Sequence, residues 1–418
     1  MASLQPLSIR LVKAEWVGET PSPAYDALSP RQRRAHIDKH PLSYLTVTRG
    51  PEDLPAGTVW DKQIATDSAR KALARLLDAE VFSDLHHNSI FVYRLIDEHH
   101  TQVAIVSGVD VADYHSGVVR PHEQLVQTRA QVLADQLQVV RTQSSPIAMA
   151  HRPNPLIGEI TKQIIDTSLP ALDFVTEDNL TQQVWVVTDP ETIDKVRSAL
   201  ADEHLHVIDG HHRAAAAAAP GSNLSDDSQW MLCALFPSDQ LRNIAFHRCL
   251  SSVDTDALLS DLAERFAVRQ ATTLDEVNER ADDELALFAD GRWYLVPIAV
   301  PTPITADDTD LSDTNDLDNR AQRALENLDS VRLQTEVLGP ILDLQPGQAS
   351  GHLDYISGAG DLDDLEQISE TDRGAVWIMR PVPMDVFLLV SESSLTLPPK
   401  STYFVPKARS GIFLRQLG

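Results

Sequence analysis

The spacing of apolar residues along the chain predicts helices and strands that alternate over most of its length. Residues 67–79 place Ala69, Leu73, Leu76 and Leu77 three to four positions apart, which indicates one apolar stripe on a helix. Other segments show helical or alternating spacing in the same way. We expect further helices at 29–40, 125–140, 190–200, 254–266 and 321–342, and strands at 89–96, 102–109, 184–187, 205–208, 231–236, 244–247, 293–298, 376–379, 386–390 and 412–414.

This alternation predicts an α/β or α+β fold, with mixed sheets and packed helices. A chain of 418 residues is long enough for two or three domains of typical size. We expect an α/β core over residues 1–250, a second α/β lobe over 251–390 and a C-terminal segment over 391–418. Residues 302–319 contain six Asp and no basic residue, which indicates an acidic, mobile loop in the second lobe.

Charge and composition exclude several classes of function. The chain has 35 basic and 61 acidic residues, a net charge of −26, which disfavours binding to a nucleic acid. No window of about 18 apolar residues could span a membrane, and residues 1–17 lack the apolar core of a signal peptide. Cys233 and Cys249 offer neither a disulfide framework nor metal-ligand spacing, and we expect both in the core. These features fit a cytoplasmic protein.

One short segment carries more chemistry than any other. Leu205-His206-Val207-Ile208 predicts a short buried strand, and Asp209-Gly210 predicts a sharp turn, because Gly takes a positive φ without a Cβ clash. His211-His212-Arg213 then leads into Ala214 to Ala219, a strong helix former that Pro220 ends. Two imidazoles and a guanidinium therefore lie at or beside a helix N-terminus.

Such an end binds anions readily, and Arg213 adds a fork suited to phosphate oxygens. The segment therefore predicts an oxyanion or phosphate site, in which His and Asp could move protons. The alternative is a buried Asp–His pair that braces a turn. We favour the functional site, because two His and an Arg on one tight turn are costly for packing alone.

Two further segments are candidates. Pro121-His122-Glu123, with Arg129 beyond it, lies between an apolar strand and a helix, so Glu123 is either a general base or a capping residue of the first turn. Near the C-terminus, Lys400-Ser401-Thr402 presents one cation and two hydroxyls after two prolines, with Lys407 close behind. This cluster is either a recognition loop for phosphate or carboxylate, or an ordinary surface turn.

Several of these motifs, in this order, resemble the DUF1015 family, from about residue 8 to about residue 415. The Asp-Gly-His-His-Arg and Pro-Pro-Lys-Ser-Thr motifs are specific, whereas Tyr-Asp alone is weak. The first of them also resembles a motif of free-serine kinases in the ParB/sulfiredoxin-like superfamily, where it grips nucleotide phosphates. The motifs are Tyr25-Asp26, Pro121-His122-Glu123, Ser145-Pro146-Ile147, Asp209-Gly210-His211-His212-Arg213, and Pro398-Pro399-Lys400-Ser401-Thr402-Tyr403-Phe404 with Pro406-Lys407.

The resemblance implies a ParB/sulfiredoxin-like nucleotide-binding core and a kinase that phosphorylates the hydroxyl of a small metabolite, such as free serine or a hydroxy acid. ATP or ADP would be the phosphoryl donor, with Mg²⁺. Asp209 or Glu123 would hold Mg²⁺ or accept the hydroxyl proton, and Asp209 is the candidate metal ligand. His211 and His212 are further catalytic candidates. The remaining assignments are nucleotide contacts by Gly210, His211, His212, Arg213, Lys400, Ser401 and Thr402, and substrate contacts by His122, Arg129 and Lys407.

Electrostatics favours a C-terminal segment that returns to the cleft of the phosphate turn. A phosphate site on so acidic a chain needs local cations, and the chain has only eight lysines. We therefore expect Lys400 within about 12 Å of Arg213, close to the ~10 Å screening length at 0.1 M salt.

Other functions on the same scaffold are less favoured. Sulfiredoxin chemistry needs a cysteine in the phosphate turn, where this chain has His211. A ParB-like switch on DNA needs a basic module that the charge argues against. A protein that senses a nucleotide or phosphometabolite without turnover stays open as the alternative. The expected partners are a nucleotide and a small substrate, with no nucleic acid and no membrane, and a homodimer is compatible with the sequence.

Overall fold

The structure is a computed structural model that describes residues 2–48, 62–123, 125–219, 226–301, 304–312, 316–344, 353–358 and 374–418. Its contacts divide the chain into two units. The first comprises Met1–Pro121, Leu125–Arg242 and Pro406–Gly418, and the second comprises His122–Gln124 and Asn243–Val405. The expected boundary after residue 250 thus lies after Arg242, and the expected C-terminal segment 391–418 is shared between the units.

The first unit is built on one mixed sheet, to which the described residues contribute twelve strands. They are β1 (Leu4–Gln5), β2 (Leu7–Val12), β3 (Phe82–Ile96), β4 (Thr101–Asp110), β5 (Val119–Arg120), β6 (Thr142–Gln143), β7 (Ile147–His151), β8 (Leu172–Val175), β9 (Thr181–Val187), β10 (Leu205–Asp209), β11 (Trp230–Pro237) and β20 (Phe413–Gln416). The main order is β5-β10-β7-β11-β4-β3-β2-β20-β6, while β1 joins β4, and β8 and β9 extend from β3. Because β10 is parallel to β5 but antiparallel to β7, the sheet is mixed as expected.

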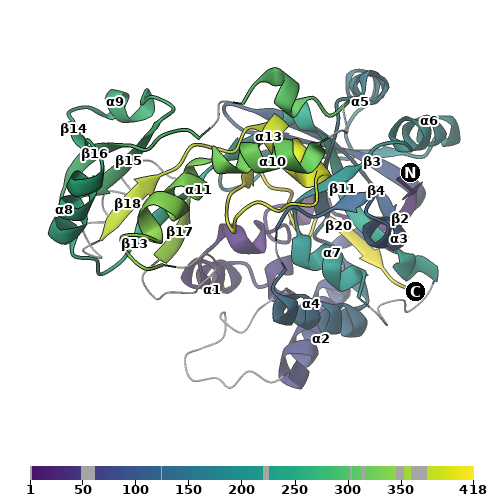
Figure 1. The fold of residues 1–418 in the computed structure, drawn as a ribbon. Coiled ribbons are helices and arrows are strands. Elements are labelled where there is room, and N and C mark those ends of the chain that lie inside the picture. Colours follow the sequence, from purple (N-terminus) through teal and green to yellow (C-terminus); the bar gives the residue numbers. More distant parts are fainter. Residues whose placement is uncertain are drawn as a thin grey trace. The chain divides into compact units, whose positions relative to one another are not determined.

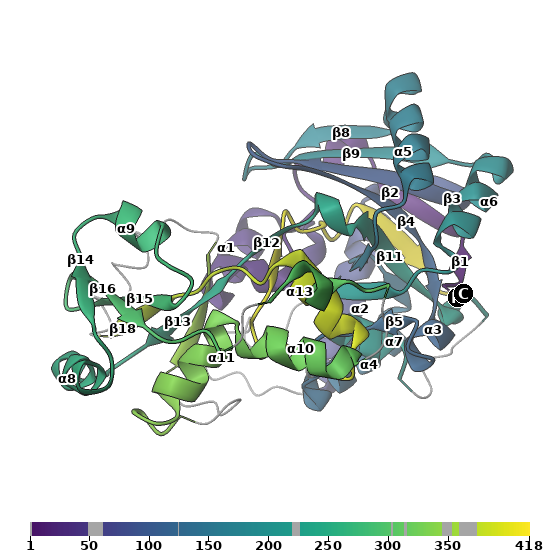
Figure 2. The ribbon, with the colours of Figure 1, turned by 45° about the horizontal axis from the view of Figure 1, so that its top comes forward.

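Helices pack against this sheet and close its core. They are α1 (Pro30–Lys39), α2 (Lys62–Asp78), α3 (Val111–His115), α4 (Gln127–Val140), α5 (Pro155–Thr167), α6 (Pro190–Leu200) and α7 (His211–Ala217). Side chains of α5, α6 and α7 join one apolar cluster with those of β7, β10 and β11. Figures 1 and 2 show α2, α4 and α7 side by side, and α5 next to α6. Ser29 caps the start of α1 and forms a capping box with Gln32.

The second unit has its own antiparallel sheet, in the order β14-β16-β15-β18-β13-β17. Its strands are β13 (Phe246–Leu250), β14 (Arg269–Ala271), β15 (Glu284–Ala289), β16 (Arg292–Pro297), β17 (Leu353–Ser357) and β18 (Ala375–Ile378), and its helices are α8 (Thr255–Arg265), α9 (Leu274–Asn278), α10 (Leu317–Glu326), α11 (Asp329–Leu333) and α13 (Met384–Glu392). The strand expected at 244–247 is interrupted at Ala245, between β12 (Arg242–Ile244) and β13. β12 pairs with β19 (Tyr403–Val405).

Two expected elements of the second unit are wrong. Residues 386–390 were predicted as a strand, but they lie in helix α13. All five are buried, and a short, fully apolar run shows no period that separates a helix from a strand. Residues 321–342 were predicted as one helix, but Leu328 adopts an extended conformation that separates α10 from α11. A π-helical turn, Gln334–Leu338, follows α11.

The acidic segment is anchored where the structure describes it. Residues 302, 303 and 313–315 of the expected loop, and Pro220 of the alanine helix, lie outside the described residues. Arg320 donates to the carbonyl oxygens of Asp307 and Asp310 at 3.2 and 2.9 Å, and Arg323 pairs with the Asp308 carboxylate. Basic residues just beyond the segment therefore hold it in a turn, whereas composition alone predicted mobility.

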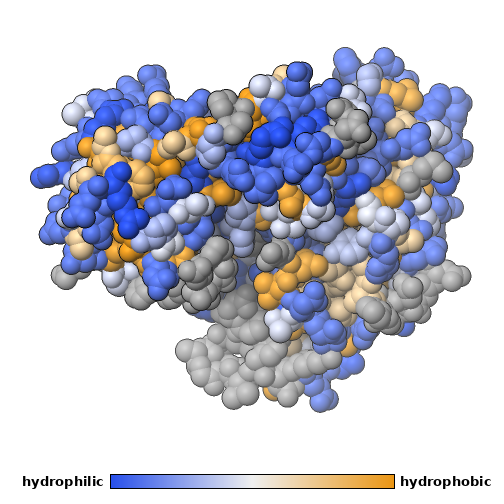
Figure 3. Space-filling view, in the orientation of Figure 1, coloured by the Kyte–Doolittle hydropathy of each residue, from blue (hydrophilic) through white to orange (hydrophobic). Residues whose placement is uncertain are grey.

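The distribution of hydrophilic and apolar residues between surface and core agrees with the composition of the chain. Hydrophilic side chains dominate the face drawn in Figure 3, and the apolar ones form small groups. Cys233 and Cys249 are both buried, as predicted. Within the described ranges, no helix combines the length and the apolar character that crossing a membrane requires.

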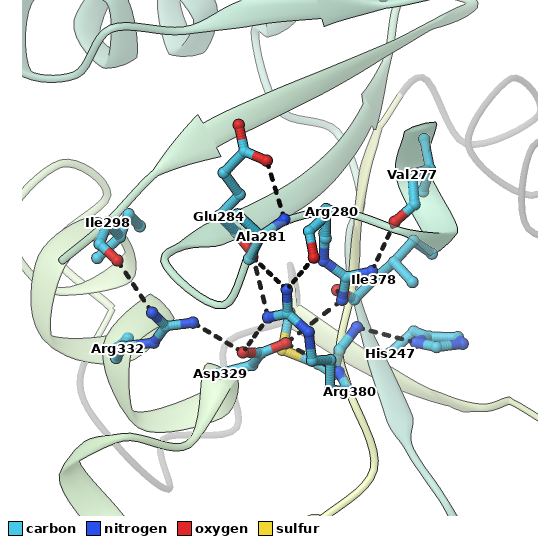
Figure 4. Close-up of polar contacts among 11 residues, drawn as sticks. His247, Val277, Arg280, Ala281, Glu284, Ile298, Asp329, Arg332, Ile378 and Arg380 are labelled. Atoms are coloured by element: carbon cyan, nitrogen blue, oxygen red, sulfur yellow. Dashed lines mark hydrogen bonds and ion pairs between the residues drawn. The ribbon is translucent and has the colours of Figure 1, made fainter. Parts of the chain in front are cut away.

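A buried ionic cluster holds together the second unit (Figure 4). The Asp329 carboxylate, 5% exposed, accepts from the guanidinium groups of Arg280, Arg332 and Arg380 at 3.4, 2.9 and 3.0 Å. The backbone N–H of Arg380 adds a bond of 2.9 Å. Arg280 also donates to the Ile378 carbonyl oxygen, so that the cluster ties α11 to strand β18.

Asp329→Asn should lower the free energy of unfolding by about 3–5 kcal/mol, because it leaves three largely buried guanidinium groups without a counter-charge. Urea unfolding of the whole chain measures this change. The matched control is Asp261→Asn on the exposed face of α8, which should change stability by less than about 0.5 kcal/mol. Equal effects of both variants would show that the cluster is unimportant for stability.

Candidate functional site

The predicted strand, turn and helix at residues 205–217 are confirmed. Strand β10 ends at Asp209, Gly210 has φ of 93°, and α7 begins at His211. A Cβ at Gly210 would lie 2.9 Å from Cζ of Arg213. Both the positive φ and the close guanidinium therefore require glycine at this position.

The centre of the site is a carboxylate held by two cations. Asp209 accepts from Arg213 through one oxygen and from the Lys407 ammonium group through the other, at 2.7 Å. Side-chain exposure is only 16% for Asp209 and 11% for Lys407. Burial raises the pKa of the Asp209 carboxyl, but Lys407 and Arg213 outweigh it, so that the net pKa lies well below its usual range. Asp209 is therefore ionised at neutral pH and is a weak base.

Arg213 also binds the loop that precedes β7. Its Nη1 donates to the carbonyl oxygens of Ser145 and Pro146, both at 2.7 Å. These residues begin the Ser145-Pro146-Ile147 motif, so two of the sequence motifs lie against each other. The guanidinium fork that was expected to contact phosphate oxygens thus fixes the turn to the neighbouring loop.

The C-terminal segment delivers Lys407 to the turn from almost 200 positions further along the chain. On either side of Lys407, the Pro406 carbonyl oxygen accepts from Gln102 at 2.8 Å, and the Gly411 N–H donates to Ser144 at 3.0 Å. Sequence reasoning selected Lys407 as a substrate contact. The structure shows it as a partner of Asp209.

The protonation of His211 and His212 decides how much positive charge the turn carries. Burial lowers the pKa of His211 to about 4, although the charge of Asp209 opposes this shift, so the imidazole is neutral at pH 7. Nε2 of His212 accepts from the Val126 N–H at 3.2 Å, which places the proton of the neutral ring on Nδ1. The cations that the structure places on this turn are therefore Arg213 and Lys407.

A second group of predicted residues lies in the second unit. His122, fully buried, is 2.9 Å from Oγ1 of Thr402, and Ser401 donates to the Pro398 carbonyl oxygen at 2.7 Å. Ser401 and Thr402 are themselves buried, and these bonds hold their loop in shape. The ammonium group of Lys400 lies 5.1 Å from the centre of the Phe246 ring.

The remaining candidates differ in exposure. Glu123 is partly buried in the second unit, and Arg129 is exposed on α4 of the first. The expected proximity of Lys400 and Arg213 concerns two different units and stays a prediction.

Sequence reasoning missed Arg248, which supports the Lys400 loop. Only 4% exposed, Arg248 donates to the carbonyl oxygen of Lys400 at 3.1 Å and stacks on the Tyr355 ring at 4.6 Å. Burial lowers its pKa to about 10. An arginine between apolar residues of the strand Phe246-His247-Arg248-Cys249-Leu250 was the available signal, because arginine is rarely buried without partners.

The expected metal ligand does not lie in a cluster of metal-binding residues. Over the parts of the chain that the structure describes, no three His, Cys, Asp or Glu side chains converge as a metal site requires. Both carboxylate oxygens of Asp209 already accept from cationic groups.

Comparison with known proteins identifies the family. The family model described as "Protein of unknown function (DUF1015)" matches residues 6–332, so the chain belongs to this family, as its motifs predicted. A search of curated proteins found no match.

Solved structures show weak similarity. A free serine kinase in complex with AMP is 14% identical, with 73% of this chain and 91% of that chain covered, at a TM-score of 0.35. A conserved hypothetical protein from Pyrococcus furiosus is 13% identical, with 73% and 95% covered, at 0.33. SbnI with a C-terminal truncation, from Staphylococcus aureus, is 10% identical, with 73% and 85% covered, at 0.34.

The low pKa of His211 predicts a pH dependence of stability. Between about pH 6.5 and pH 4 the unfolded chain binds a proton at His211 that the folded chain does not, so this residue makes stability rise with pH in that window. His211→Gln should therefore reduce the difference in unfolding free energy between about pH 5 and about pH 7.5. Urea unfolding at both pH values measures it.

The control is His99→Gln, since the His99 side chain is 71% exposed and should leave the pH dependence unchanged. An identical pH dependence in wild type and His211→Gln would contradict the assignment of a buried, neutral His211.

Proposed function

We propose that the protein is a nucleotide-dependent kinase that phosphorylates the hydroxyl of a small metabolite, such as free serine or a hydroxy acid. In this reaction the hydroxyl oxygen forms a bond to the terminal phosphorus of ATP or ADP, and the bond from that phosphorus to the leaving nucleotide breaks. The hydroxyl proton passes to a base. Positioning and charge stabilisation supply most of the catalysis of phosphoryl transfer.

One observation carries the proposal: Arg213 and Lys407 both contact the carboxylate of Asp209 at a glycine turn that begins a helix. Lys407 and Arg213 exceed Asp209 by one positive charge, on a chain whose net charge is −26. The first-turn N–H groups of a helix lack partners within the helix and favour an anion. Backbone and charge therefore both favour a phosphate at Gly210–Arg213.

The two candidate carboxylates suit different roles. Asp209 is a weak base, because its pKa is strongly lowered, and its contacts with Lys407 and Arg213 suit a positioning role. Glu123 is therefore the base we propose. Lys400, Ser401 and Thr402 are proposed to contact the nucleotide, and His122 and Arg129 the substrate.

Magnesium does not fit Asp209, because a metal ion there would compete with Lys407 and Arg213 for the same two oxygens. Mg²⁺ commonly binds through substrate phosphates and few protein groups, so the proposal needs no protein cage for it. No step of the proposal runs through a metal held by Asp209.

The same contacts favour a second candidate function. With both oxygens of Asp209 engaged and His211 neutral, the turn could hold a nucleotide or phosphometabolite without turnover, as a sensor does.

A screen of nucleotide consumption distinguishes the two functions. ATP and ADP are offered with magnesium and with serine, small hydroxy acids or polyols, and binding of each nucleotide is measured by calorimetry. A phosphorylated product supports the kinase, and binding without product supports the sensor. Absence of nucleotide binding would overturn the kinase and the nucleotide sensor.

Arg213→Ala should weaken the binding of an adenine nucleotide by about 1.5–3 kcal/mol, the range for hydrogen bonds to charged groups. The variant loses a cation and also the two bonds that fix the turn to Ser145 and Pro146. Calorimetry measures the affinity, with Arg197→Ala on the exposed face of α6 as the control. Equal affinity of wild type and Arg213→Ala would remove the role assigned to Arg213.

Glu123→Gln should lower kcat more than it raises KM, because a base acts in the chemical step. Asp209→Asn, in contrast, should lower both nucleotide affinity and stability, because it leaves Lys407 and Arg213 without their shared partner. Steady-state kinetics on the acceptor found in the screen test this difference. A Glu123→Gln enzyme with wild-type kcat would show that Glu123 is not the base.

A further inference from the structure

A cavity of about 110 Å³ lies beside Arg213, within the first unit. Helices α4 and α7 and the start of β7 supply its apolar wall. The small side chains of Ala216 and Ala217 line it, so part of the alanine run leaves space as well as forming a helix. The apolar lining residues include Leu133, Leu137, Val140, Ile147, Ala216 and Leu232.

Among the described residues that line the cavity, Arg213 alone carries a charge. Arg213 is paired with Asp209, and burial raises the pKa of Tyr44 to about 12, so its phenol stays protonated. A charged group among the apolar lining residues would lose its hydration, and the guanidinium of Arg213 already donates to Ser145, Pro146 and Asp209. The cavity therefore favours an uncharged group.

Two glutamines at the cavity give it a hydrogen-bonding edge. Gln136 donates through its amide nitrogen to the Val47 carbonyl oxygen, and Gln143 accepts through its amide oxygen from the Leu232 N–H at 2.9 Å. Among the described residues, neither the amide oxygen of Gln136 nor the amide nitrogen of Gln143 makes a hydrogen bond that a ligand would have to replace. One acceptor and one donor are thus available beside the apolar wall.

We propose that this cavity binds the six-membered heteroaromatic ring of a nucleobase. At about 110 Å³ the cavity is smaller than the apolar cavity of about 150 Å³ that is known to hold benzene, so it can take the edge of one six-membered ring but no extended group. A base has apolar faces for the aliphatic wall and a polar edge for the two amides. This inference rests on the proposed function, because the phosphates of the same nucleotide would lie on the turn at Gly210–Arg213.

Filling the cavity tests the proposal. Val140→Phe adds a ring at a lining position, while Val139→Phe makes the same change one position earlier on α4, where the side chain is 39% exposed and does not line the cavity. Calorimetry follows three probes: AMP, adenosine and ribose 5-phosphate. Thermal melting confirms that each variant is folded.

We expect Val140→Phe to weaken the binding of AMP and of adenosine at least tenfold and to leave the affinity for ribose 5-phosphate unchanged. Val139→Phe should have the affinities of wild type for all three probes. If Val140→Phe does not fold, Leu137→Phe replaces it, and methyl shifts of Ile147 on adding adenosine to wild type report on the cavity directly. Undiminished AMP binding in a folded, filled variant would overturn the proposal. It would also be overturned if wild type bound ribose 5-phosphate as tightly as AMP, because the base would then add nothing to the affinity. Adenosine binding that depends on the cavity, without any binding of ribose 5-phosphate, would support the cavity and contradict the phosphate turn.

Discussion

The contact between Asp209 and its two cations is the interaction on which the site depends. Asp209 ends β10, Arg213 lies one turn into α7, and Lys407 comes from the C-terminal segment, so one carboxylate joins three separate parts of the first unit. Arg213 extends the connection to Ser145 and Pro146. Because this group of charges is largely buried, losing the Asp209 carboxylate would leave both cations without a counter-charge, which is costly in a protein interior.

This arrangement also explains the residues around the turn. Glycine is required at position 210 by its positive φ and by the guanidinium 2.9 Å away from where a Cβ would lie. His211 is buried and neutral, so the turn gains its positive charge from Arg213 and Lys407 alone among the groups the structure places there. On a chain with only eight lysines, this use of Lys407 concentrates charge at one place.

Much of the fold was predictable from local patterns. The strand, turn and helix at 205–217, the β3–β4 hairpin and the capped helix after Ser29 follow from apolar spacing, a glycine turn and a cap, which act over a few residues. Helix α13 was not predictable, because a fully buried run has no polar face to reveal its period. The site divides in the same way: the sequence indicated Asp209 and Arg213 as neighbours, whereas the Lys407 contact and the support that Arg248 gives to Lys400 depend on long-range packing that no local pattern encodes.

The central claim is that the turn held by Lys407 and Arg213 receives a nucleotide phosphate. Backbone amide chemical shifts of an isotopically labelled protein, followed by NMR during a titration with AMP, test this claim most directly. The account predicts that the largest shifts occur at Gly210, His211, His212 and Arg213 and saturate with the affinity measured by calorimetry. Saturable AMP binding that leaves these four amides unshifted would contradict it.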